Sequence, residues 1–147
     1  MQYLLFEDQS HFDLLPLTFT RPVADLRVGI DKLSEKWARF LGEQPGWIAF
    51  DYLAARFSAF NPTLESICLN SKFVPNAAFV QEVIEACAPG TYLLNEKREI
   101  IAFRCRPVQL GEWDGIVTQE LLEAAGLVSQ HAPAHNRPAI RFPWDIF

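Results

Sequence analysis

Residues 14–30 read LLPLTFTRPVADLRVGI and decide how the N-terminal part of the chain is organised. They follow a short apolar run and precede the first amphipathic helical pattern. Pro16 and Pro22 exclude a helix through the middle of the stretch, because each proline fixes φ and lacks an N–H group. A loop that leaves a strand and carries hydroxyl groups and arginine is a suitable anion cradle. The alternative is a surface connection that the prolines stiffen.

Length and composition indicate one packed domain over residues 1–147. Half of the residues are hydrophobic and 13% are aromatic, which excludes a disordered chain. No apolar run is long enough to span a bilayer, so we expect no membrane partner. The first apolar run ends at Glu7 and Asp8, too early for a signal peptide.

The three cysteines, Cys68, Cys87 and Cys105, are widely spaced and lie in apolar patterns. Neither a disulfide framework nor a metal-binding Cys-x-x-Cys motif follows from this spacing. Reduced, buried thiols in a cytoplasmic protein are the expectation.

The net charge of −5 argues against a nucleic-acid partner. Residues 21–39 nevertheless hold five basic and three acidic side chains. This local excess of positive charge suits a small phosphorylated ligand. The alternative is that Lys32, Glu35, Lys36 and Arg39 form an ordinary solvated helix face.

Apolar periodicity predicts alternating strands and helices. Strands are expected over residues 2–6, 47–50, 64–69, 91–94, 99–103 and 139–142, and helices over residues 30–41, 76–87 and 118–125. Asp31 and Thr118 are the expected N-caps, and Gly42 and Gly126 the expected helix ends. A helical turn is expected after Asp51, and residues 12–29 and 129–138 are expected to be loops.

This alternation predicts an α/β fold with a largely parallel sheet flanked by helices. The two strands on either side of residues 95–98 add an antiparallel hairpin.

Residues 16–29, PLTFTRPVADLRVG, resemble the P-L-T-x-x-R-P-K-x-L-x-x-G-type run of nucleotidyltransferases that activate sugar 1-phosphates. With the EKW of residues 35–37, they look like a divergent bacterial subgroup. Its members are related to the bifunctional N-acetylglucosamine-1-phosphate uridylyltransferase/glucosamine-1-phosphate acetyltransferase. Residues 142–147, FPWDIF, are similar to the junction where such a domain leads into a left-handed β-helix, and residues 70–79 match an internal segment.

The resemblance implies a single Rossmann-like domain of the nucleotidyltransferase type. It also implies that a sugar 1-phosphate oxygen attacks the α-phosphorus of a nucleoside triphosphate and that pyrophosphate leaves. The expected reaction is uridylyl transfer to N-acetylglucosamine 1-phosphate in the cytoplasm, for cell-envelope precursor synthesis. Mg²⁺ is implied as the cofactor that offsets the developing charge.

The resemblance also assigns roles to residues of the opening stretch. Arg21 is the implied catalytic residue, facing the phosphates. The implied nucleotide- or phosphate-binding residues are Thr18, Thr20, Arg27 and Gly29, with Asn70 and Lys72 as further candidates.

The chain departs from the family pattern at three places. Residues 7–12 contain no glycine where the family has a glycine-rich turn, and Val23 replaces a lysine. Residues 70–72, Asn-Ser-Lys, stand where the family has Asn-Gly-Asp with a Mg²⁺-binding aspartate. These departures favour an alternative function, a catalytically degenerate domain of the same fold that binds a nucleotide sugar or acts as a scaffold.

Other side chains are candidates for replacing the lost groups. Glu7 and Asp8 are candidates for a metal carboxylate, and the alternative is that they are solvated acids at a strand end. Lys72 is a candidate phosphate contact, and the alternative is a surface lysine. The metal ligands are not identified.

No run of hexapeptide repeats is present, so the β-helix of the relatives is not in these residues. The resemblance therefore implies that residues 1–147 are the N-terminal part of a longer chain. The missing β-helix would carry acetyl transfer and trimer assembly.

Overall fold

The computed structural model describes residues 2–6, 8, 27–28, 31–43, 45–48, 63–73, 75–95, 97–110 and 117–131. Several predictions from the sequence fall outside these residues. They are most of the loop over residues 12–29, the helical turn after Asp51, the strand over residues 139–142 and the junction over residues 142–147.

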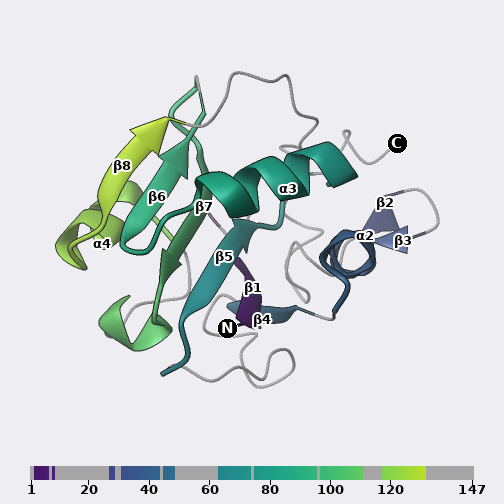
Figure 1. Cartoon of the computed structure of the whole chain (residues 1–147), viewed down its shortest axis with the longest axis horizontal. Coiled ribbons are helices and arrows are strands. Elements are labelled where there is room, and N and C mark those ends of the chain that lie inside the picture. Colours follow the sequence, from purple (N-terminus) through teal and green to yellow (C-terminus); the bar gives the residue numbers. More distant parts are fainter. Residues whose placement is uncertain are drawn as a thin grey trace.

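A six-stranded sheet in the order β4-β1-β5-β7-β6-β8 forms the centre of the described structure (Figure 1). The strands are β1 (Gln2–Phe6), β4 (Gly46–Ile48), β5 (Ser66–Asn70), β6 (Thr91–Leu94), β7 (Ile100–Cys105) and β8 (Val128–His131). A separate antiparallel pair joins β2 (Arg27–Val28) to β3 (Asp31–Lys32).

Five of the six strands run in one direction. β1 pairs with β4 and β5 in parallel, and β6 pairs with β8 in parallel. Only β7 runs the other way, because it is antiparallel to both β5 and β6. The predicted largely parallel sheet with one antiparallel hairpin is therefore confirmed. The carboxyl ends of β1, β5 and β6 consequently share one edge with the turn between β6 and β7.

Side chains alternate between the two faces of the sheet, and each face has its own core. Leu4 and Phe6 of β1 belong to one buried cluster, whereas Leu5 belongs to the other. β5 is buried at every position, as expected for a central strand covered on both faces. Its sequence therefore shows no polar alternation.

Helices cover both faces. α2 (Leu33–Leu41) and α3 (Ala77–Ala86) pack on the face that contains Leu5, where Trp37 and Phe79 are fully buried. α4 (Gln119–Ala124) and the short 3₁₀ helix η3 (Pro107–Leu110) pack on the other face through Leu122 and Leu110. This is the predicted sheet flanked by helices (Figure 1).

Thr118 and Gly42 lie at the helix ends that the sequence predicts for them, and Asn76 is a further N-cap. The Asn76 side chain accepts a hydrogen bond from the N–H of Phe79, and Thr118 does the same for the N–H of Leu121. Gly42 ends α2 with φ 78°, a left-handed conformation that glycine adopts without a Cβ clash.

Two local predictions were wrong. Asp31 does not cap α2, because it pairs with Val28 in the β2–β3 pair, and the helix follows Lys32 instead. The prediction of a loop over residues 129–138 is wrong at its start, because residues 129–131 belong to β8 and pair with β6. Val128, Ser129 and Gln130 are exposed, so this edge strand has no buried apolar face to reveal it in the sequence.

The three cysteines are free and buried, as predicted. Burial raises the pKa of each thiol: well above its ordinary value for Cys68, to about 12 for Cys87 and to about 11 for Cys105. Among the described residues, no helix combines the length and apolar character that a bilayer crossing requires.

The buried thiols are expected to be unreactive in the folded protein. A disulfide reagent at pH 8 should modify none of Cys68, Cys87 and Cys105 on the time scale of minutes, because the thiolate is the nucleophile and the raised pKa keeps each thiol protonated. All three should react at once in concentrated guanidinium chloride, which serves as the control. Rapid modification of the folded protein would contradict this burial.

Candidate functional site

A cluster of five polar residues lies at the edge formed by the carboxyl ends of β1, β5 and β6. Asp8 follows β1, Asn70 ends β5, and Lys72 lies two residues further on. Asn95 follows β6, and Glu99 precedes β7. In open α/β sheets this edge is where ligands bind. These five residues are called the edge cluster below.

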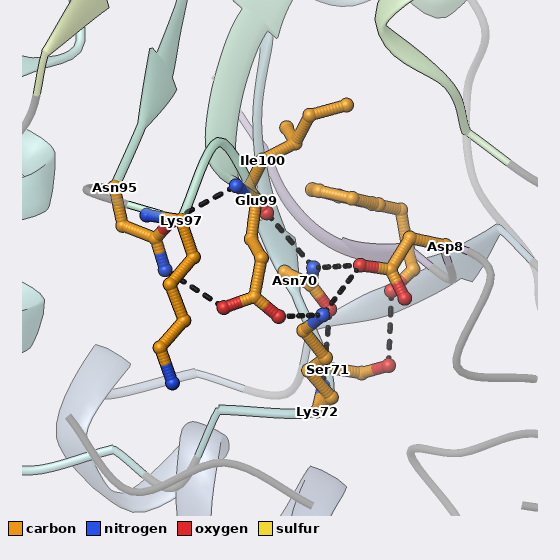
Figure 2. Close-up of polar contacts among 9 residues, drawn as sticks. Asp8, Asn70, Ser71, Lys72, Asn95, Lys97, Glu99 and Ile100 are labelled. Carbon is orange, nitrogen blue, oxygen red and sulfur yellow. Dashed lines mark hydrogen bonds and ion pairs between the residues drawn. The ribbon is translucent and has the colours of Figure 1, made fainter. Parts of the chain in front are cut away.

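Lys72 lies at the centre of the edge cluster (Figure 2). Its Nζ is 2.6 Å from Oε2 of Glu99 and 2.9 Å from Oδ2 of Asp8. Only 6% of the Lys72 side chain is exposed, against 13% of Asp8 and 17% of Glu99. The ring of Phe73 adds a cation–π contact, with its centroid 5.6 Å from the same nitrogen. One buried cation therefore joins two acidic side chains from different segments.

Asn70 joins the same segments through hydrogen bonds. Its Nδ2 donates to Oδ2 of Asp8 and to the carbonyl oxygen of Ile100, both at 2.8 Å. Its Oδ1 accepts the backbone N–H of Lys72 at 3.2 Å. Asn70 is 1% exposed, and all these contacts hold its amide in one orientation.

Asn95 fixes the turn that carries Glu99. Its Oδ1 accepts the backbone N–H groups of Lys97 and Glu99, and its Nδ2 donates to Oε1 of Glu99 at 2.9 Å. Arg98 has φ 60° in this turn, a left-handed conformation that is uncommon for a residue with a Cβ. The hydrogen bonds of Asn95 hold that conformation, and they aim the Glu99 carboxylate at Lys72.

The backbone beneath the edge cluster is also held firmly. Ser71 donates from its N–H and from its Oγ to the carbonyl oxygen of Phe6. The indole Nε1 of the buried Trp37 donates to the carbonyl oxygen of Phe73 at 3.1 Å. Both neighbours of Lys72 in the chain are therefore fixed, one to β1 and the other to α2.

The contacts of Lys72 with two carboxylates make its ammonium a poor ligand for a phosphate. Two carboxylates face one ammonium group, which leaves a formal charge of −1 on Asp8, Lys72 and Glu99 together. The hydrogen bonds to charged partners are short, as is typical of charge-assisted bonds. A phosphate at Lys72 would have to compete with both carboxylates.

The structure brings together two of the residues that the sequence singled out as nucleotide- or phosphate-binding candidates, Asn70 and Lys72. The interpretation of Lys72 as a surface lysine was wrong, because its ammonium is buried between carboxylates. Asp8 does bind a cation, but within the described residues that cation is the Lys72 ammonium.

The other predicted site residues lie wholly or partly outside the described part of the chain. Arg27 lies in β2, and the position of its side chain is outside what is described. Thr18, Thr20, Arg21 and Gly29 lie outside the described residues, so their roles stay predictions.

Sequence reasoning missed Asn95 and Glu99 as members of the site. Both were assigned to a hairpin on the pattern of residues 91–103 alone. The order of the strands in the sheet brings the hairpin turn next to residues 70–72. Sequence patterns do not predict this order of strands in the sheet.

The family described as sugar nucleotidyl transferase matches the chain over residues 3–147. The chain belongs to the sugar nucleotidyl transferase family. The match includes residues 14–30 and every member of the edge cluster. Membership of the sugar nucleotidyl transferase family supports nucleotidyl transfer to sugars in general, with nucleotide and sugar-phosphate substrates. No curated protein sequence matches the chain.

The residues of the edge cluster do not fit the Mg²⁺ ion that the resemblance implies. Mg²⁺ prefers carboxylate oxygens, and Asp8 and Glu99 supply them. Both, however, already contact Nζ of Lys72, and a divalent cation between them would lie against that ammonium group. No group of three or more His, Cys, Asp or Glu suited to a metal occurs in the described part of the chain.

Replacing Lys72 by Met is expected to destabilise the fold strongly. The variant replaces the ammonium by an apolar group, so Asp8 and Glu99 lose their ion pairs with Lys72. Breaking a buried ion pair in this way costs about 3–5 kcal/mol in the free energy of unfolding, which urea titration measures.

The matched control is Lys97→Met, in the hairpin turn that carries Glu99. Lys97 is exposed, and the bond from its backbone N–H to Asn95 survives the substitution. Its loss should change the free energy of unfolding by less than about 0.5 kcal/mol. Equal effects of the two substitutions would contradict the central role of Lys72.

Proposed function

We propose that this domain transfers a uridylyl group from UTP to an N-acetylhexosamine 1-phosphate, such as N-acetylglucosamine 1-phosphate. The observation that supports this most is the match to the sugar nucleotidyl transferase family over residues 3–147. The edge cluster adds support, because it lies where open α/β sheets bind their ligands.

The reaction requires little covalent work from side chains. A phosphate oxygen of the sugar 1-phosphate forms a bond to the α-phosphorus of UTP, while the bond from that phosphorus to the pyrophosphate oxygen breaks. Catalysis then depends on positioning and on neutralising the charge of the phosphates. In our proposal Arg21 neutralises that charge, and Thr18, Thr20, Arg27 and Gly29 contact the phosphates or the nucleotide. These roles come from the resemblance of residues 16–29.

Lys72 and Asn70 take a different role in this proposal. Their contacts with Asp8 tie the segment that follows β1 to the end of β5. The loop over residues 14–30 begins a few residues after Asp8. Lys72 and Asn70 therefore position the base of the phosphate-binding loop, while the phosphates bind at Arg21.

A second candidate is a catalytically degenerate domain of the same fold that binds a nucleotide sugar or serves as a scaffold. One observation favours it specifically. The Lys72 ammonium is engaged by two carboxylates, so the cluster offers neither a vacant carboxylate pair nor an unpaired ammonium for a phosphate. Under this candidate, UDP-N-acetylglucosamine binds without turnover.

The finer features of the proposal come from the likeness to bacterial relatives of the bifunctional uridylyltransferase/acetyltransferase. They are a cytoplasmic location, a role in cell-envelope precursor synthesis and trimer assembly through an additional left-handed β-helix. Each of them is part of the proposal.

Isothermal titration with UTP and with UDP-N-acetylglucosamine, each with and without Mg²⁺, tests the proposed function. We expect micromolar binding, and we expect Arg21→Ala to weaken it by about 10- to 100-fold, since a hydrogen bond to a charged group contributes about 1.5–3 kcal/mol. Release of pyrophosphate on addition of N-acetylglucosamine 1-phosphate then separates transfer from binding alone.

Arg106→Ala is the matched control for Arg21→Ala. Arg106 is exposed and follows Cys105, which pairs with Ser66 at the start of β5, so it lies at the opposite edge of the sheet. Its loss should leave binding unchanged. Heat equal to that of dilution for every ligand would reject both the transfer reaction and the binding alternative, leaving a scaffold.

A further inference from the structure

The Lys72 ammonium lies between two carboxylates from different segments of the chain. It contacts one oxygen of Asp8 and one oxygen of Glu99, at 2.9 Å and 2.6 Å. These distances suit N–H···O bonds from an ammonium group, whereas Mg²⁺ binds oxygen at about 2.0–2.1 Å and Ca²⁺ at about 2.3–2.6 Å. The two carboxylates thus bind a positive charge as they would in a metal site, but here the charge belongs to a lysine side chain.

Both carboxylates are held by groups other than Lys72. Asn70 donates to Oδ2 of Asp8, and Asn95 donates to Oε1 of Glu99. The backbone N–H of Glu99 is bound by Asn95 as well. Because these bonds do not depend on the ammonium, the two carboxylates should stay near each other when it is removed. Two carboxylates held close together attract a divalent cation.

The neighbouring amide supplies a third oxygen. Oδ1 of Asn70 accepts only the N–H of Lys72 among the hydrogen bonds described for it, and it lies beside the ammonium-bearing chain (Figure 2). Carboxylate and amide oxygens are hard ligands suited to Mn²⁺, Mg²⁺ or Ca²⁺.

We propose that the ammonium of Lys72 is a built-in substitute for a divalent cation at the edge cluster. The wild-type chain therefore binds no divalent cation between Asp8 and Glu99, and removal of the ammonium together with its side chain turns the cluster into a divalent-cation site. A consequence for the reaction rests on the proposed function: substrates bind at this edge without a metal held by Asp8 and Glu99. The cation substitution itself does not rest on that function.

The test compares Mn²⁺ binding to the wild-type chain, Lys72→Ala and Lys72→Met, with no nucleotide present. The electron paramagnetic resonance signal of free Mn²⁺ gives the affinity, and the thermal midpoint gives the stabilisation. Lys72→Ala opens room for a hydrated ion and should bind with a dissociation constant on the order of 10⁻⁴–10⁻³ M, as in weak oxygen-ligand sites. Its thermal midpoint should rise with Mn²⁺. Lys72→Met fills the same space with an uncharged side chain, so its thermal midpoint should not change when Mn²⁺ is added.

The double variant Lys72→Ala with Asp8→Asn identifies the site. Its affinity for Mn²⁺ should be at least about tenfold lower than that of Lys72→Ala, because one of the two carboxylates is gone. If Lys72→Ala folds only when Mn²⁺ is present, that result also supports the proposal, since metal binding then supplies folding free energy.

Three results would overturn the proposal. They are Mn²⁺ binding to the wild-type chain that Asp8→Asn abolishes, a Lys72→Ala variant that does not respond to Mn²⁺, and a Lys72→Ala variant that stays unfolded at every Mn²⁺ concentration. None of these measurements involves UTP or a sugar phosphate. A failure to bind nucleotide would therefore reject the proposed function and leave this inference standing, and the reverse also holds.

Discussion

The ion pairs of Lys72 with Asp8 and Glu99 connect three segments of the chain, and the hydrogen bonds of Asn70 connect the same three. Asp8 extends β1, Lys72 extends β5, and Glu99 begins the return strand of the hairpin. A buried charge is costly without its partners, so the three segments must come together for any of these charges to be tolerated. The hydrogen bonds of Asn70 and Asn95 set the directions from which the carboxylates approach. The arrangement of this edge of the sheet therefore depends on the ammonium group together with the two asparagine side chains.

The direction of the strands explains why these groups meet. Parallel strands send their carboxyl ends to one edge, and β1, β5 and β6 do so here. Because β7 is antiparallel, it contributes its first residues to that edge, and Glu99 arrives from the start of a strand. In a wholly parallel sheet, a crossover connection would have to precede the strand that brings a second acidic side chain to this edge. The short turn after Asn95 makes that crossover unnecessary.

Much of the fold could be predicted from the sequence, but little of the site. Apolar runs and helix caps located β1, β5, α3, α4 and the hairpin, because those signals are local. β8 was missed because an exposed edge strand has no apolar face, and Asp31 was misread because its role depends on pairing with Val28. The burial of Lys72 depends on which strands are neighbours, and periodicity does not encode that order. Residues 16–29 indicated the family, which the match over residues 3–147 confirms, without showing where the edge cluster forms.

The distance along the chain between β1 and β5 has a consequence during synthesis. The side chains of Leu4, Leu5 and Phe6 are buried, and the β5 partners of their strand are Cys68, Leu69 and Asn70. At about 5–20 residues per second, the ribosome needs about 3–12 s to add the roughly 60 residues between them. During that interval an apolar strand has left the ribosome without its central neighbour, and Asp8 has no ammonium group from Lys72. The nascent chain is therefore open to chaperones at its N-terminal segment until β5 emerges.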